Sequence, residues 1–446
     1  MAKFFIFLSI VIFLVLPVIV SGEDLPGATT HAVPAVAEAK IDTGDTAWIL
    51  ISTALVMLMT PGLALFYGGM VRGKNVLGTI MQSFVAISLI SVQWILIGYS
   101  LSFGPDINGL IGSLDWIGLR GVGIEPNPDY APTIPHMAFM IYQAMFAVIT
   151  PALITGAFAE RMKFSAYVLF ILLWSTVVYD PVAHWVWGTG GWLKNMGVLD
   201  FAGGIVVHLI SGISALAAAL IIGRRKGYLQ EAMYPHNLPM TVLGTGLLWF
   251  GWFGFNAGSA LSAGALSTMA FVATHTSAVS ATLIWVIIEW IHRGKPTMFG
   301  AATGSIAGLA TITPASGFVS PMSALIIGLA AGAVCYVALN MKTKIGYDDS
   351  LDAFGVHGIG GILGTVATGL FASTLINPAG GNGLLFGSHQ LLASQMTALT
   401  VTAVYSFVVT VILLKVIDKF IGLRIDQESE QHGLDISQHG ESGYSN

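Results

Sequence analysis

The sequence predicts an all-α membrane protein that crosses the bilayer about eleven times. Of its 446 residues, 55% are apolar and 9% are charged, whereas soluble domains carry roughly 25% charged residues. The mean hydropathy is +0.79. The apolar residues form separate stretches of about 20 residues, each long enough to cross a hydrocarbon layer of about 30 Å as a helix. A soluble core cannot bury so much apolar surface, so these stretches are predicted to be transmembrane helices.

The first 44 residues are predicted to lie outside the helical domain. Lys3, a long apolar run and the small residues before Glu23 predict a signal peptide at residues 1–22. An uncleaved anchor is the alternative, because the apolar run is long for a signal peptide. Residues 23–44 are predicted to form an extracytoplasmic N-terminal lead-in.

The transmembrane domain is predicted at residues 45–420. It divides into two blocks of five helices, followed by one long final helix. Both blocks contain a late Leu-Asp followed by a histidine, and an odd number of spans per block makes such repeats inverted in the membrane. The predicted helices cover residues 46–71, 76–103, 133–157, 162–187, 200–223, 237–257, 264–292, 297–312, 319–341, 354–374 and 391–420.

The distribution of Lys and Arg predicts the orientation. Most of the 18 lie in alternate loops and in the C-terminal segment, and short cytoplasmic loops hold the excess of positive residues. The N-terminus is therefore predicted outside the cell and the C-terminus inside.

Several function classes are disfavoured by composition. The formal net charge of -5 leaves no basic patch for nucleic acid. The single Cys335 excludes an intramolecular disulfide and a metal-thiolate cluster. The spans offer no nucleophile with its base and no metal set, so we expect neither an enzyme nor a cofactor.

Two histidines lie inside predicted spans, at His208 and His357. Ionisable residues there cost at least about 2.5 kcal/mol, so they usually face a pathway or a partner. Their related positions in the two blocks favour a functional pair at mid-depth over a packing role. A zinc site is a weaker alternative, because it needs at least three protein ligands.

Acidic residues precede both histidines. Asp200 lies eight residues before His208, and Asp352 lies five residues before His357 on the cytoplasmic side. Asp200 could attract a cation or hold helix ends together, and the second role is favoured; Asp352 is expected to act likewise. Structural pairs or caps are expected at Glu160 with Arg161 and at Glu289 with Arg293.

Aromatic residues gather near the predicted outer ends of the spans, at Trp187, Phe146, Phe255 and Tyr142. Such residues often anchor a protein in the membrane interface. Their ring faces can instead hold a cation, each contributing about 0.5 to 2 kcal/mol, together with an acceptor such as the Ser259 hydroxyl. Composition does not choose between these roles.

Six segments resemble the signature blocks of the Amt/Mep/Rh ammonium transporter family, of the bacterial and archaeal Amt type. The resemblance extends from about residue 45 to 446, in order and with matching spacing. The segments are AMFAVITPALITGAFAERMKFSA (144–166), AHWVWG (183–188), LDFAGGIVVHLISGISAL (199–216), GWFGFNAGSA (251–260), RGKP (293–296) and DAFGVHGIGGILG (352–364).

This resemblance implies a homotrimer in the cell's inner membrane, each subunit carrying its own narrow ammonium pore. An ammonium sensor and a Rhesus-like gas channel are the alternatives. Deprotonation suits such a pore, because a bare cation costs on the order of tens of kcal/mol to move into hydrocarbon and neutral ammonia only a few. The implied roles are recruitment by Trp187, Phe146 and Ser259, gating by Phe146 and Phe255, proton relay by His208 and His357, and helix stabilisation near the entrance by Asp200.

The C-terminal segment, residues 421–446, resembles the family's cytoplasmic regulatory tail. A plain charged tail is the alternative. The resemblance implies contact with a neighbouring subunit and with a trimeric P-II signalling protein. The matching residues are Gly433, Asp435, His439, Gly440 and Glu441.

Overall fold

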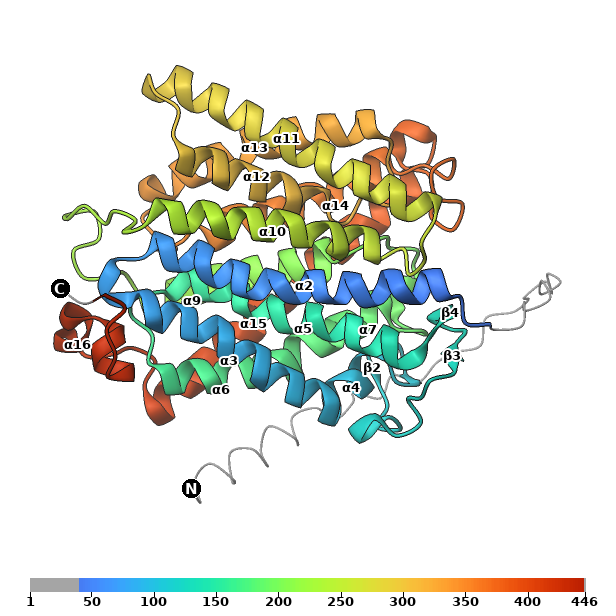
Figure 1. Ribbon diagram of the computed structural model, residues 1–446, viewed down its shortest axis with the longest axis horizontal. Helices are drawn as coiled ribbons and strands as arrows, with labels where there is room; N and C mark the ends of the chain where they lie inside the picture. Colours follow the sequence, from blue (N-terminus) through green and yellow to red (C-terminus); the bar gives the residue numbers. More distant parts are fainter. Residues whose placement is uncertain (1–39, 445–446) are drawn as a thin grey trace. The chain divides into compact units, whose positions relative to one another are not determined.

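The computed structural model describes residues 40–444, and its elements are mainly long helices that run alongside one another (Figure 1). The α-helices are α2 (Thr43–Met70), α3 (Val76–Gln93), α4 (Tyr99–Phe103), α5 (His136–Phe158), α6 (Phe164–Trp174), α7 (Asp180–Trp187), α8 (Trp192–Asn195), α9 (Ile210–Ile222), α10 (Leu238–Gly258), α11 (Ala265–Arg293), α12 (Met298–Ile312), α13 (Pro321–Ile345), α14 (Ile359–Phe371), α15 (His389–Ile421) and α16 (Gln427–His432).

Short antiparallel strand pairs lie at the opposite end of the helical domain from α16 (Figure 1). We call these the hairpin end and the tail end. Strand β1 (Asp106–Ile107) pairs with β2 (Ile111–Gly112), and β3 (Pro126–Asn127) pairs with β4 (Ala131–Pro135). Both pairs belong to the connection between α4 and α5.

The predicted all-α membrane fold is confirmed. Ten helical segments among the described residues are long and apolar enough to cross a membrane, and the shorter apolar helix α12 occupies the eighth predicted span. The final helix α15 is the long one expected at the end of the domain. A count of eleven spans and a trimer stay predictions.

The N-terminal boundary differs slightly from the prediction. Helix α2 begins at Thr43, because the Asp42 carboxylate accepts a hydrogen bond from the Asp45 N–H at 2.9 Å and caps the helix. The helical domain therefore begins two residues before its predicted start at residue 45, and residues 23–39 of the predicted lead-in lie outside the described residues. The predicted signal peptide, residues 1–22, lies outside the described residues.

The two halves of the domain cross where both histidines lie. A π-helical turn, Gly204–Leu209, leads into α9, and a second one, Phe354–Gly358, leads into α14. A Cβ on Gly212 would meet Gly358 N at 2.1 Å, and a Cβ on Gly361 would meet Leu209 N at 2.7 Å. Each glycine follows its histidine by four residues, so the two crossings are related in the way an inverted repeat requires.

Charged residues gather at the tail end of the helices. Glu160 is buried and pairs with Arg72 at 2.9 Å and with Arg225 at 3.2 Å, and Arg225 also pairs with Asp348 at 2.8 Å. The expected pair of Glu160 with Arg161 does not form, because the Arg161 guanidinium donates to carbonyl oxygens such as those of Ala157 and Asp348.

The second expected pair does form at the end of α11. The Glu289 carboxylate lies 3.8 Å from the Arg293 guanidinium. It also accepts a hydrogen bond from the Thr297 N–H at 2.9 Å, which connects α11 to the start of α12.

Candidate functional site

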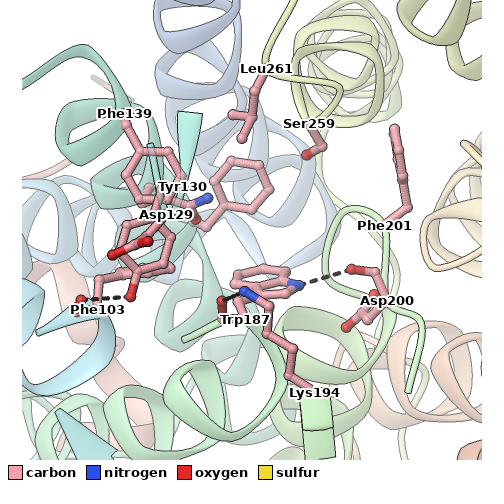
Figure 2. Close-up of a pocket in the computed structure, with 12 residues that line it drawn as sticks. Phe103, Asp129, Tyr130, Phe139, Trp187, Lys194, Asp200, Phe201, Ser259 and Leu261 are labelled. Atoms are coloured by element: carbon pink, nitrogen blue, oxygen red, sulfur yellow. Dashed lines mark hydrogen bonds between the residues drawn. The ribbon is translucent and has the colours of Figure 1, made fainter. Parts of the chain in front are cut away.

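A pocket of about 150 Å³ opens at the hairpin end, above the place where the halves cross (Figure 2). It combines aromatic faces with a few polar groups. Figure 2 shows Tyr130, Trp187, Lys194 and Ser259 around it, contributed by segments far apart in the chain. Its lining residues are Phe103, Asp129, Tyr130, Phe139, Gln143, Phe146, Trp187, Lys194, Asp200, Phe201, Ser259 and Leu261.

Trp187 ends α7 and is held by a hydrogen bond from its indole N–H to the Asp200 carbonyl oxygen at 2.8 Å. Its ring meets Phe146 nearly at right angles, with centroids 6.0 Å apart and an interplanar angle of 88°. This bond fixes the orientation of the ring face, which is the surface that attracts a cation.

Ser259 supplies an acceptor oxygen to the same pocket. Its hydroxyl donates to the Phe255 carbonyl oxygen at 2.9 Å, and the Tyr142 hydroxyl lies 3.2 Å away. Because the Ser259 proton is used, the remaining lone pairs of its oxygen can accept a hydrogen bond from a cation such as a protonated amine.

Two phenyl rings close the pocket on the side of the membrane interior. Phe146 and Phe255 are both buried, and their centroids are 4.3 Å apart. The Tyr142 hydroxyl lies 2.9 Å from the Phe255 carbonyl oxygen, so Tyr142 braces the backbone beside these two rings. The rings form an apolar barrier between pocket and interior.

Beneath this barrier, His208 and His357 face each other. Their rings stack with centroids 5.2 Å apart, and the two Nδ1 atoms lie 3.3 Å from each other. One Nδ1 must donate and the other accept, so the pair shares a proton across this contact. The Nε2 atom of His208 is buried and has no hydrogen-bond partner among the described residues.

The histidines line a second, much smaller cavity of about 10 Å³. This space is close to the least that holds one water. Apart from the two imidazoles, every lining residue is apolar or aromatic: Met59, Leu63, Phe66, Ile149, Leu153, Val207, Leu248, Trp252, Phe255 and Ile306. Such a narrow apolar space favours a small neutral molecule over an ion.

Asp200 organises the start of the first histidine segment. Its two carboxylate oxygens accept hydrogen bonds from the backbone N–H groups of Gly203, Gly204, Ile205 and Val206, at 2.6 to 3.1 Å. The carboxylate thereby satisfies N–H groups that a helix start leaves without partners. Asp200 therefore holds both this helix start and, through its carbonyl oxygen, Trp187.

The equivalent role in the second half belongs to Asp349, and the expectation for Asp352 was wrong. Asp349 accepts hydrogen bonds from Ala353 N at 3.1 Å and Phe354 N at 2.8 Å. Asp352 has a φ of 61° and instead pairs with Lys342. A backbone turn at Asp352 directs its side chain away from the helix start.

Among the residues of this region that sequence reasoning missed are Gln143, Lys194 and Asp349. Gln143 lines the pocket with a buried carbonyl oxygen, Oε1, that has no hydrogen-bond partner among residues 40–444. Lys194 lines it from the short helix α8, in a segment to which the sequence assigned no role. Asp349 could have been found, because it precedes His357 by eight residues, as Asp200 precedes His208. No group of three or more His, Cys, Asp or Glu in the described part of the chain is arranged to hold a metal ion.

Comparisons with known proteins identify the family. Residues 47–444 match the model of the Ammonium Transporter Family. The chain is 53% identical to an ammonium transporter of Bacillus subtilis, over 90% of this chain and 98% of the relative. It is 51% identical to the ammonium transporter Amt1 of Archaeoglobus fulgidus, over 90% of this chain and 99% of the relative.

Solved structures give the same result. The crystal structure of Saccharomyces cerevisiae Mep2 superimposes with a TM-score of 0.82 and 36% identity, covering 87% of this chain and 88% of that one. A structure described as a sensor Amt protein superimposes with a TM-score of 0.83 and 29% identity, covering 89% of this chain and 98% of that one. The chain thus belongs to the ammonium transporter family, and it is a transporter or channel for ammonium rather than an enzyme.

Proposed function

We propose that this ammonium transporter recruits its substrate as an ion, deprotonates it, and passes ammonia and the proton separately along the two histidines. The observation that carries the proposal is an unbroken row of rings from the pocket to the histidine pair. Successive centroids of Trp187, Phe146, Phe255, His208 and His357 are 6.0, 4.3, 5.9 and 5.2 Å apart. This row connects a site suited to a cation with a cavity suited to a neutral molecule.

Recruitment takes place in the pocket at the hairpin end. An ammonium ion there meets the faces of Trp187 and Phe146 and donates a hydrogen bond to the Ser259 oxygen. Each ring face contributes about 0.5 to 2 kcal/mol. These groups bind a cation without a full negative charge, so the ion is released easily.

Deprotonation lowers the barrier at the two phenyl rings. An intact cation beyond Phe146 and Phe255 would lose its water, at a cost on the order of tens of kcal/mol, whereas ammonia loses only its hydrogen bonds. The shared proton between His208 and His357 provides a relay parallel to the ammonia path. Potassium has no proton to give, so it is rejected at this step. Ammonia and the proton cross separately, and together they carry one net positive charge.

Current on a solid-supported membrane after an ammonium jump tests the proposal in reconstituted protein. We expect a current with ammonium and none with potassium. In the double variant His208→Ala/His357→Ala, the current should disappear or lose its discrimination against potassium. A matched control is His275→Ala on α11, which leaves both the histidine pair and the pocket lining intact.

An unchanged, selective current in the double variant would contradict the relay. Ammonium binding without current would instead favour electroneutral passage of ammonia, as in a Rhesus-like gas channel, and a pH-dye flux assay would detect that passage. Binding without either signal would indicate an ammonium sensor, which the histidine-lined cavity does not favour.

The membrane arrangement and the partners belong to the same proposal. The protein lies in the inner membrane as a homotrimer, with the hairpin end outside and the tail end in the cytoplasm, where a P-II signalling protein binds. The lysines and arginines at the tail end support this orientation. Cysteine-accessibility labelling at Arg120, in the connection between α4 and α5, and at Glu428, in α16, distinguishes the two orientations.

A further inference from the structure

A lysine side chain reaches into the pocket that recruits the cation. Lys194 lies in the short helix α8, seven residues after Trp187, and it lines the pocket with Trp187 and Ser259. Its Nζ donates a hydrogen bond to the Trp187 carbonyl oxygen at 3.0 Å and lies 5.7 Å from the centroid of the Tyr130 ring. Figure 2 shows its side chain running alongside Trp187.

The head group of Lys194 has the same chemistry as the substrate. It is a primary ammonium that binds one oxygen acceptor and one aromatic face. The pocket offers ammonium the same two kinds of partner, in Ser259 and in the faces of Trp187 and Phe146. Lys194 thus places one positive charge permanently beside the site where a second one must bind.

Neighbouring acids do not cancel this charge directly. Asp129 lines the same pocket but forms no ion pair with Lys194. The Asp200 carboxylate is occupied by four backbone N–H groups. The Lys194 charge can therefore act on an incoming cation, weakened by solvent, because the residue is exposed, and by the nearby Asp129 carboxylate.

We propose that Lys194 is a tethered competing cation that weakens ammonium binding in the outer pocket and so sets the concentration range of transport. The inference rests on the proposed recruitment site. Two unit charges about 7 Å apart in an aqueous environment repel enough to change affinity about threefold. The repulsion falls when salt shortens the screening length to about 8 Å or less.

The test measures the half-saturating ammonium concentration from currents in reconstituted protein at low and at high salt. In Lys194→Gln we expect this concentration to fall about threefold at low salt and to approach the wild-type value at high salt. Lys194→Arg restores the charge and should restore the weaker binding. Arg120→Gln is the matched control, because it removes one exposed positive charge from the same end of the protein without lining the pocket.

A rise of the half-saturating ammonium concentration in Lys194→Gln would overturn the inference. If Lys194 acts only by holding the Trp187 backbone, Lys194→Gln raises the half-saturating concentration and the effect does not depend on salt. An equal shift in Arg120→Gln would assign the effect to the overall surface charge, which also contradicts a local role.

Trp187→Leu separates this inference from the proposed function. If Trp187→Leu raises the half-saturating concentration while Lys194→Gln leaves it unchanged, the recruitment site stands and the role of Lys194 fails. If Trp187→Leu has no effect, recruitment at this pocket fails, and with it the basis for the inference.

Discussion

Asp200 and Asp349 act at the scale of single residues, each holding the start of a histidine segment from eight positions upstream. Asp349 binds two backbone N–H groups, at Ala353 and Phe354. Asp349→Asn replaces one acceptor oxygen by a donor that faces an N–H, and a buried unsatisfied donor costs about 1 to 3 kcal/mol. We expect the thermal midpoint in detergent to fall accordingly and the ammonium current to weaken as His357 shifts.

Asp352→Asn serves as the control for this prediction. It loses the ion pair with Lys342, whose two side chains are only 14% and 15% exposed, but no hydrogen bond to the helix start. The ammonium current, rather than stability, is therefore the readout that separates the two variants. A weaker ammonium current in Asp352→Asn than in Asp349→Asn would show that the position of His357 does not depend on Asp349.

Single residues also show how much of the candidate site could be predicted from the sequence. Both histidines could be located because an ionisable group inside an apolar helix is costly and therefore conspicuous. Asp352 was chosen over Asp349 because the repeated Leu-Asp pair was aligned instead of the eight-residue spacing. Only the backbone geometry, with a positive φ at Asp352, shows which carboxylate faces the helix start.

At the scale of elements, the crossing of α9 and α14 depends on two glycines. A Cβ at Gly212 would lie 2.1 Å from Gly358 N, and one at Gly361 would lie 2.7 Å from Leu209 N. Backbone cannot move aside as a flexible side chain can, so either alanine substitution must separate the helices. We expect Gly212→Ala and Gly361→Ala each to lower stability by about 1 to 3 kcal/mol and to disturb the histidine pair.

Gly246→Ala in α10 is the matched control, since a Cβ there meets nothing within 4 Å. Replacing a helical glycine where space is free should stabilise by about 0.5 to 1 kcal/mol. Thermal unfolding of the three variants and the wild type makes the comparison. An equal thermal midpoint in all three variants would mean that the helix crossing tolerates extra volume.

Helix positions were predictable to within a few residues, because span length follows directly from the thickness of the membrane. The π-helical turns at Gly204–Leu209 and Phe354–Gly358 could not be predicted from the sequence. They depend on how each segment packs against the opposite half of the domain, and local sequence carries no such information. The same holds for Tyr130 and Lys194, which line the pocket from separate parts of the chain, whereas Ser259 was expected there.

At the scale of the whole molecule, Glu160 joins loops that follow different helices. Burial alone would raise the pKa of Glu160, but Arg225 and Arg72 outweigh burial and hold this pKa below its usual value. A carboxyl with a lowered pKa stabilises the fold above its unfolded pKa, about 4.3, and loses that contribution as pH falls through the folded pKa.

Glu160→Gln should therefore lower the thermal midpoint by the same amount at pH 7 and at pH 5.5. The difference from wild type should narrow only below about pH 4, where the wild-type carboxylate begins to take up its proton. Glu125→Gln, an exposed residue, should leave the midpoint unchanged throughout. A difference that already vanishes between pH 7 and pH 5.5 would show that the ion pairs do not hold the Glu160 pKa down.

The C-terminal tail docks on the same chain's helices through Asp435. Its carboxylate accepts hydrogen bonds from Gly78 N at 2.8 Å and Leu77 N at 3.1 Å, at the start of α3. A second contact joins Leu434 N to the Asn75 side chain at 2.8 Å. Other contacts hold other parts of the tail, among them hydrogen bonds to Glu430 from Lys226 N and to Gln438 from Phe164 N. Asp435, by contrast, caps one helix start, and removing such a cap costs about 0.5 to 2 kcal/mol.

Asp435→Ala should release the tail while leaving the membrane domain folded. Segments that are held by few contacts open at lower free energy than the core. We therefore expect faster hydrogen exchange at residues 427–441 and little change in the thermal midpoint. Glu441→Ala, at an exposed position of the same tail, is the control and should exchange like wild type. Unchanged exchange in Asp435→Ala would mean that other contacts, such as the hydrogen bond from the Lys226 N–H to the Glu430 carboxylate at 2.7 Å, are enough to hold the tail in place.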